Sequence, residues 1–433
     1  MAVKEILQKI FNVRREELVP VLVATLFFFF VLTALMVVRP ARDALGMQRG
    51  IESVRWLFMG TAVVTLMVNP VFAWLVSHYR RIQFISATYA FFSLGLLGFW
   101  ALLMFAPDAI GTASGQVFYV WFSVFNLFAT MLFWALLADR FTLEQSKRFF
   151  ALIAAGGTLG AIFGPWLAWQ LAEPLGTPFL LLLSAGFLLL SIGTAWLLAR
   201  SEAASVDVPV ADKNSEAGII GGNAWGGFKS VFRSSYLMGI AGYVMILSVV
   251  LTFIYFTRLQ LVAAAGDGLD ERTALLGSID MWTQIAVLVL QLSLTGHLMK
   301  RLGVHVALAL LPLTAAIGFI GLAVYGSLVV LILLEAVVRA VQRAITRPAR
   351  ETLYTVVNRE DKYKAKAFID TFVYRGGDVA GAQTEGLLGR LGMGLAGLAS
   401  VVLPMALAWA ALGIWLGREQ QRRSKAMAAN STR

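Results

Sequence analysis

The chain has 433 residues, of which 59% are hydrophobic and only 14% are charged. A soluble domain carries roughly a quarter of charged residues, so this composition excludes an ordinary water-facing surface. Apolar runs of about twenty residues recur along the chain, and each matches the roughly 30 Å hydrocarbon core of a bilayer. We therefore expect an all-α membrane protein, because helices satisfy their backbone polar groups within one segment inside lipid.

The net charge of +11 does not indicate nucleic-acid binding. The Lys and Arg residues lie mainly in short loops between apolar runs, where they orient a protein in the membrane. The sequence contains no cysteine, which excludes disulfides and thiolate metal sites. None of its three histidines has a second metal ligand at helical spacing. The sequence contains neither a nucleophile-elbow motif nor a paired-carboxylate motif of an enzyme. We expect no metal, no cofactor, no nucleic-acid partner and no enzymatic activity.

Apolar runs and helix breakers together predict about twelve transmembrane helices. The first six are expected at 18–38, 56–77, 82–105, 116–137, 149–171 and 178–199. The last six are expected at 236–262, 274–295, 304–325, 328–346, 367–388 and 395–415. The first run follows Glu16 and Glu17 and is too long for a signal peptide, so it should remain as a helix.

Basic residues gather on one side of the predicted membrane. Loops 106–115 and 172–177 contain no Lys or Arg. The opposite side holds Arg14, Arg15, Arg80, Arg81, Lys147, Arg148, Lys300, Arg301, the cluster 347–366 and the tail 418–425. The positive-inside rule makes that side cytoplasmic. We expect both termini in the cytoplasm and a multi-pass protein of a bacterial inner membrane.

A polar segment divides the chain. Residues 1–200 are predicted to form an N-terminal six-helix half, 201–235 a cytoplasmic linker, and 236–433 a C-terminal six-helix half with a basic tail. Arg80-Arg81 and Lys300-Arg301 recur at an offset of about 220 positions, which favours a duplicated unit. Two parallel six-helix repeats resemble the arrangement of the major facilitator superfamily.

The end of the linker has an amphipathic pattern. Trp225, Phe228 and Phe232 share a helical face beside Lys229 and Arg233, as in a helix lying on a lipid surface. An early start of the seventh span is the alternative.

Glycines at helical spacing predict close helix packing. Gly156, Gly160 and Gly164 are spaced by four in the fifth span, and Gly377 and Gly381 are spaced by four in the eleventh. Small residues at this spacing let a neighbouring helix approach closely.

Charges at membrane depth are the candidates for function, because each costs roughly 2.5–3.5 kcal/mol at a helix centre. Arginine predominates among them, and guanidinium binds phosphate or carboxylate through paired hydrogen bonds. The predicted substrate-binding residues are Arg39, Arg42, Arg258, Arg339 and Arg375. The predicted coupling or gating residues are Asp43, Asp280, Glu335, Arg350, Glu351 and Asp378. The acids can pair with arginines until an anion displaces them.

Several of these charges have a purely structural alternative. Glu335 and Arg339 are four apart, so an internal ion pair can neutralise both. Asp280 can be a buried, hydrogen-bonded carboxylate rather than a coupling site.

Arg39 and Arg258 end the first helices of the two predicted halves. Together with Arg42, they can instead snorkel to the outer interface. Because they stand at almost the repeat offset, we expect Arg39 and Arg258 to face one another across a pseudo-two-fold axis.

Four stretches resemble the ATP/ADP translocases of plastids and obligate intracellular bacteria. The stretch 38–45 (VRPARDAL) is similar to the family's R-x-x-K-D-x-L element, with Arg42 and Asp43 at its Lys-Asp positions. The second stretch, 133–150, contains FW, ADRF and SKRFF and resembles the family's fourth span and the loop after it. The third, RPARETLY at 347–354, resembles the family's P-T-K-E-x-x-Y element. The fourth, KYKAKAFID at 362–370, resembles its K-Y-K-A-K-x-x-I-D element.

The resemblance implies exchange of a nucleotide or phosphorylated metabolite, with basic residues of spans one and eleven at the substrate. After Arg375 the family reads G-K-S-G-G, whereas this chain places Asp378 where a lysine is expected. We expect a monomeric transporter in the lipid bilayer for a small anionic solute. The alternatives are a proton-coupled transporter of another organic anion, lipid or drug, and a non-transporting sensor or scaffold.

Overall fold

The computed structural model describes residues 17–78, 81–106, 108–201, 224–294 and 298–431. Within these ranges the chain is almost entirely helical and contains no strand, which confirms the all-α fold class. Most of the predicted linker 201–235, the basic residues before Glu17, and Arg80 and His297 lie outside the described residues.

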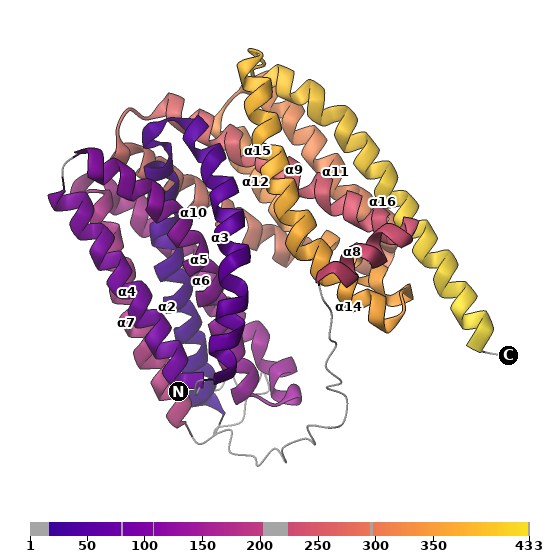
Figure 1. The fold of residues 1–433 in the computed structure, drawn as a ribbon, viewed down its shortest axis with the longest axis horizontal. Coiled ribbons are helices and arrows are strands. Elements are labelled where there is room, and N and C mark those ends of the chain that lie inside the picture. Colours follow the sequence, from indigo (N-terminus) through magenta and orange to yellow (C-terminus); the bar gives the residue numbers. More distant parts are fainter. Residues whose placement is uncertain (1–16, 79–80, 107, 202–223, 295–297, 432–433) are drawn as a thin grey trace. The chain divides into compact units, whose positions relative to one another are not determined.

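The chain forms two compact units, which Figure 1 colours along the sequence. Unit 1 contains the helices up to Arg200 together with Val262–Gln284, and unit 2 contains the described chain from Ala224 to Leu261 and from Ile285 onward. The predicted division into halves 1–200 and 236–433 stays a prediction.

Unit 1 is a helical bundle. Its helices are α2 (Leu18–Gly46), α3 (Ile51–His78), α4 (Arg81–Phe105), α5 (Asp108–Arg140), α6 (Leu143–Leu175) and α7 (Thr177–Arg200), and it includes the first part of α10 (Leu269–Leu294). Gly277 of α10 lies against α6, where a Cβ atom would be 2.8 Å from the Trp169 nitrogen. Asp270 Oδ1 accepts a hydrogen bond of 2.6 Å from the Thr177 N–H at the start of α7.

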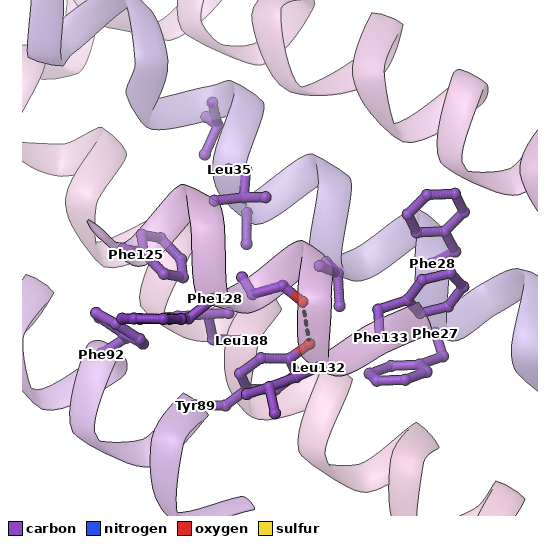
Figure 2. Close-up of a cluster of buried hydrophobic side chains, with 14 of the residues drawn as sticks. Phe27, Phe28, Leu35, Tyr89, Phe92, Phe125, Phe128, Leu132, Phe133 and Leu188 are labelled. Carbon is purple, nitrogen blue, oxygen red and sulfur yellow. Dashed lines mark hydrogen bonds between the residues drawn. The ribbon is translucent and has the colours of Figure 1, made fainter. Parts of the chain in front are cut away.

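Aromatic rings fill the core of unit 1 (Figure 2). Phe28 of α2 stacks on Phe133 of α5 with ring centroids 3.9 Å apart, and Phe27 lies 5.2 Å from the same ring. The buried Tyr89 hydroxyl donates to the Ala129 carbonyl at 2.9 Å, so its polar atom is satisfied within the apolar cluster.

The predicted glycine surfaces are confirmed in both units. On α6, a Cβ atom at Gly156 or Gly160 would collide with the backbone of α2, and one at Gly164 would lie 2.8 Å from the Val37 nitrogen. In unit 2, a Cβ atom at Gly377 would lie 2.6 Å from the Ser248 Cβ. Glycine therefore sets the helix separation in both places.

Unit 2 contains more broken helices. Its helices are α8 (Ala224–Arg233), α9 (Ser235–Ala265), α11 (Leu298–Tyr325), α12 (Leu328–Val341), α13 (Arg347–Leu353), α14 (Arg359–Phe368), α15 (Tyr374–Arg390) and α16 (Leu395–Ser431). The part of α9 up to Leu261 and the part of α10 from Ile285 belong to this unit. Two π-helical turns join consecutive helices, Gln342–Thr346 between α12 and α13 and Ile369–Val373 between α14 and α15.

Every predicted span is occupied by helix over its described residues. Ten helices of the described chain are long and apolar enough to cross a membrane. The predicted spans 328–346 and 367–388 fall on α12 and α15, which are shorter, with 14 and 17 residues. Because the π-helical turns extend both, the chain is helical through 328–353 and 359–390, as a twelve-helix arrangement requires.

Several predicted boundaries were too narrow. The first helix continues past Pro40 to Gly46, so Arg39 and Arg42 lie inside it rather than at its end. Most of the predicted loop 347–366 is also helical. Hydropathy locates contact with lipid, whereas a helix continues wherever the protein satisfies its polar groups.

Helix α8 is separate from the seventh span, since it ends at Arg233 and α9 begins at Ser235. Its Phe228 and Phe232 side chains are exposed and Val231 is buried. The break at Ser234 shows that α8 is not an early start of α9, and the position of α8 on a lipid surface stays a prediction.

Candidate anion-binding site

Arginines of unit 2 surround a cavity of about 450 Å³. Small-molecule sites have volumes of roughly 300–1,000 Å³. The cavity is lined by Leu247, Gln342, Arg343, Thr346, Arg347, Arg350, Asp370, Tyr374 and Arg375. Four arginines thus accompany one carboxylate, and this excess of positive charge suits an anion.

Both π-helical turns border the cavity. The first turn supplies Gln342, Arg343 and Thr346, and the second supplies Asp370. Such turns are rare and occur often at functional sites, because they break the regular backbone pattern. At this cavity, the backbone therefore departs from regular α-helical geometry both between α12 and α13 and between α14 and α15.

Acidic partners hold two of the cavity arginines. Arg350 Nη2 lies 3.4 Å from Asp370 Oδ1, and Arg375 Nη1 lies 3.2 Å from Asp378 Oδ2. Ser248 of α9 contacts the Asp378 carboxylate through its hydroxyl.

Arg347 differs from these two. Its side chain is exposed and forms no ion pair with any described residue. It can therefore bind a ligand without first losing a carboxylate partner.

A second charged cluster is buried in unit 2. Arg339 Nη2 lies 2.6 Å from Glu335 Oε2, which is the ion pair expected from their spacing. Arg258 of α9 approaches the same oxygen at 3.7 Å, and its side chain is fully buried. Two guanidinium groups therefore share one carboxylate, and Arg339 precedes the cavity residue Arg343 by about one helical turn.

The predicted residues of unit 1 form separate pairs. Arg39 Nε lies 3.8 Å from the buried Asp280 Oδ2. Arg42 Nε donates to Asp43 Oδ1 at 2.8 Å, and its guanidinium carbon lies 4.5 Å from the centre of the Tyr119 ring. Arg42 is thus held by a carboxylate and by a cation–π contact.

The structure brings together some of the predicted site residues and not others. Arg350 and Arg375 both line the cavity, and Asp378 pairs with Arg375 without lining it. Glu351 pairs with Lys366 and does not line the cavity. The expected facing of Arg39 and Arg258 stays a prediction, since they belong to different units.

Sequence reasoning missed the contribution of Arg347, which it assigned to a loop. Arg339, Arg343 and Arg347 recur at a spacing of four, and that stripe was the available signal. Gln342, Thr346 and Tyr374 carried no such signal, because a polar or aromatic side chain in a span is ordinary.

Comparisons with known proteins identify the fold. The model of the Major Facilitator Superfamily matches residues 18–345. No curated protein sequence matches the chain. The POT family transporter PepTSo is similar in structure with a TM-score of 0.66 and 10% identity, covering 93% of this chain and 98% of that one.

Two further solved structures are similar. A variant of the nucleoside transporter NupG has a TM-score of 0.62 and 11% identity, covering 93% of this chain and 99% of that one. A bacterial homologue of the human lysosomal transporter Spinster has a TM-score of 0.58 and 13% identity, covering 94% and 93%. At these identities the likeness shows the fold alone.

Proposed function

Since the chain belongs to the Major Facilitator Superfamily and is a secondary transporter of that type, not an enzyme, we propose that it moves a phosphate-bearing anion by alternating access. The observation that carries this proposal is the cavity of unit 2, with four arginines and one carboxylate in its lining. Planar guanidinium groups match phosphate oxygens in pairs and stay charged at any physiological pH.

The arginines of unit 1 belong to the same proposal. In unit 1, Arg42 helped by Arg39 binds the anion, which competes there with Asp43 and Asp280. In unit 2, Arg258 and Arg375 bind it, and Asp378 is the competing acid. A ligand that displaces such pairs shifts a conformational equilibrium by its difference in affinity for the two states.

Nucleotide is the substrate we favour within this class. Three cavity residues lie in the stretches that resemble ATP/ADP translocases, since Arg347 and Arg350 belong to 347–354 and Asp370 ends 362–370. We propose exchange of ATP for ADP by a monomer in a bacterial inner membrane, with both termini cytoplasmic.

A second candidate is proton-coupled transport of another organic anion, a lipid or a drug. It is favoured by Asp378, a titratable group that forms an ion pair with Arg375 in the stretch where the resemblance leads one to expect a lysine. An apolar cavity of about 1110 Å³ in unit 1, lined by residues such as Phe91, Val117 and Trp121, favours a hydrophobic cargo in the same way.

Proteoliposomes distinguish the two candidates. Vesicles loaded with unlabelled ADP and offered labelled ATP should exchange, and Arg347→Gln should lower the rate at least about tenfold, as expected for loss of one charge-assisted contact. Arg42→Gln should also abolish exchange. Arg422→Gln in the exposed tail removes the same charge and should leave the rate unchanged.

The opposite result is equally specific. If no nucleotide exchanges, and a neutral or cationic compound is taken up at a rate that Arg42→Gln and Arg347→Gln do not alter, the anion proposal is wrong. Uptake of a non-nucleotide anion that requires a pH gradient would favour the second candidate.

A further inference from the structure

Unit 2 has a second polar cavity, of about 580 Å³, which shares no lining residue with the arginine cavity. Helices α8, α9, α14 and α16 contribute to it. Four of its lining residues are basic, Lys229 and Arg233 from α8, Lys364 from α14 and Arg423 from α16, and Asp361 is the acid among them. The lining therefore carries an excess of positive charge.

The acid of this cavity already has hydrogen-bond partners. The Ser230 hydroxyl donates to Asp361 Oδ1 at 2.6 Å and ties α8 to α14. This bond, with a second one to Asn358, holds the pKa of Asp361 below its usual value, so the carboxylate stays ionised. This one carboxylate faces four basic side chains in the lining, so the lining keeps an excess of positive charge.

Lys229 and Arg233 are the accessible cations of the lining. Both side chains are exposed, and neither lies within ion-pair distance of a described carboxylate, although Arg233 interacts electrostatically with Asp361. Arg423, by contrast, donates to Glu419 Oε1 at 2.9 Å.

The cavity lies where the transmembrane part of unit 2 ends. α9 begins at Ser235, directly after α8, and Arg423 of α16 covers the ring of Tyr236 at 4.5 Å. α16 has 37 residues, which at 1.5 Å per residue gives about 55 Å and exceeds the roughly 30 Å hydrocarbon core. Its charged end, which includes Arg423, therefore reaches the level of lipid headgroups.

Exposed aromatic rings border the basic residues. Phe228 and Phe232 of α8 are 43% and 57% exposed, and their ring centroids are 4.5 Å apart. Phe228 also packs at 5.8 Å against Phe368 of α14, which stacks on the 42% exposed Phe372. A row of exposed aromatic rings beside Lys and Arg is typical of a helix buried at the membrane interface.

We propose that this cavity binds the phosphate of an anionic phospholipid. Lys229 and Arg233 bind the phosphate oxygens, while Phe228 and Phe232 lie among the upper parts of the acyl chains. The aromatic row selects a lipid over a free phosphate compound, because exposed phenyl rings gain nothing from a soluble ligand. This site is independent of the transported substrate.

Lipid titration of the full-length protein in detergent tests the proposal. Native mass spectrometry should show tighter binding of phosphatidylglycerol than of phosphatidylcholine with the same chains. The double variant Lys229→Gln/Arg233→Gln should lose about tenfold to thirtyfold in phosphatidylglycerol affinity, since each interfacial cation contributes to anionic-lipid binding. The matched control Arg418→Gln/Arg422→Gln removes two exposed tail charges and should bind like the wild type.

Two further measurements complete the test. Phe228→Ser/Phe232→Ser should also weaken phosphatidylglycerol binding, and glycerol 1-phosphate should bind far more weakly than the lipid. If the Lys229/Arg233 double variant binds phosphatidylglycerol like its control, the site is refuted. If glycerol 1-phosphate binds as tightly as the lipid, the cavity takes soluble phosphates and the lipid assignment is wrong.

Discussion

Arg350 and Asp370 connect the two π-helical segments of unit 2, with Nη2 and Oδ1 3.4 Å apart. Asp370 lies within one π-helical turn and Arg350 lies one turn beyond the other. The arginine side chain is 12% exposed and the aspartate 35% exposed, so the acid is the more accessible partner. Because a phosphate would need the same guanidinium, the carboxylate occupies a position for which an anionic substrate competes.

Replacing Asp370 by asparagine should therefore strengthen substrate binding. Asp370→Asn removes the competing charge and leaves a side chain of nearly the same size, so we expect the KM for an anionic substrate to fall by up to about tenfold. The measurement is concentration-dependent uptake of labelled ADP, or of whichever anion is transported, in proteoliposomes.

Glu419→Gln is the matched control, because Glu419 pairs with Arg423 and does not line the cavity. It should leave KM unchanged. A higher KM for Asp370→Asn would indicate that Asp370 positions Arg350 for the substrate instead of competing with it.

The helices could be predicted from the sequence because lipid imposes a simple length and polarity on them. Their ends could not. Hydropathy ends the first span at Val38, yet α2 continues to Gly46, because Arg39 has Asp280 as a partner and Arg42 has Asp43. Paired charges need not leave the membrane, and no sequence pattern shows that Asp280 is the partner.

The cavity was harder to predict than the charges that line it. Pro348 ends the tenth span by ordinary rules, since a proline collides with the carbonyl four residues before it. That carbonyl belongs to Ala344, which lies inside the π-helical turn Gln342–Thr346. The irregular turn lets the helix continue, and so Arg347 and Arg350 become cavity residues rather than loop residues.

The predicted topology can be tested with reporter fusions. Loops without Lys or Arg should lie outside and the basic side inside. A fusion after Pro107 should report an external location, and one after Ser201 should report a cytoplasmic location. An identical location for both would contradict the predicted orientation and the cytoplasmic termini.

Close packing of α2 on α6 predicts a large effect of one methyl group. Gly160→Ala places a Cβ against the Phe29 carbonyl and 3.1 Å from the Thr33 nitrogen, so α2 or α6 must move. Overpacking of this kind costs about 1–3 kcal/mol, and the midpoint of thermal unfolding should fall. Gly186→Ala in α7 is the control, because no atom lies within 4 Å of its Cβ position. Equal unfolding midpoints for the two variants would show that the interface can relax.

The last prediction concerns the buried charges of unit 2. Glu335 is 3% exposed and balances Arg339 at 2.6 Å and the fully buried Arg258 at 3.7 Å. Removing one partner of a buried pair is costly, because the remaining charge keeps its desolvation penalty without its counterion. Glu335→Gln leaves two arginines without their shared carboxylate and should destabilise the protein by about 3–5 kcal/mol.

Arg339→Gln provides the comparison, since it leaves Glu335 with Arg258 and therefore keeps one negative charge opposite one positive charge. We expect its loss of thermal stability to be much smaller than that of Glu335→Gln. Arg339 is also 18% exposed, so water can compensate part of the change at its own position.

Thermal unfolding of both variants, without ligand and in the presence of ATP or inorganic phosphate, distinguishes a structural role of these charges from a role in anion binding. If the two arginines serve only as partners of Glu335 and bind no ligand, added anion should restore the thermal stability of neither variant. If the site accepts an anion, phosphate should raise the unfolding midpoint of Glu335→Gln more than that of the wild type, because the ligand replaces the missing charge. Equal stability of Glu335→Gln and the wild type would contradict the burial argument.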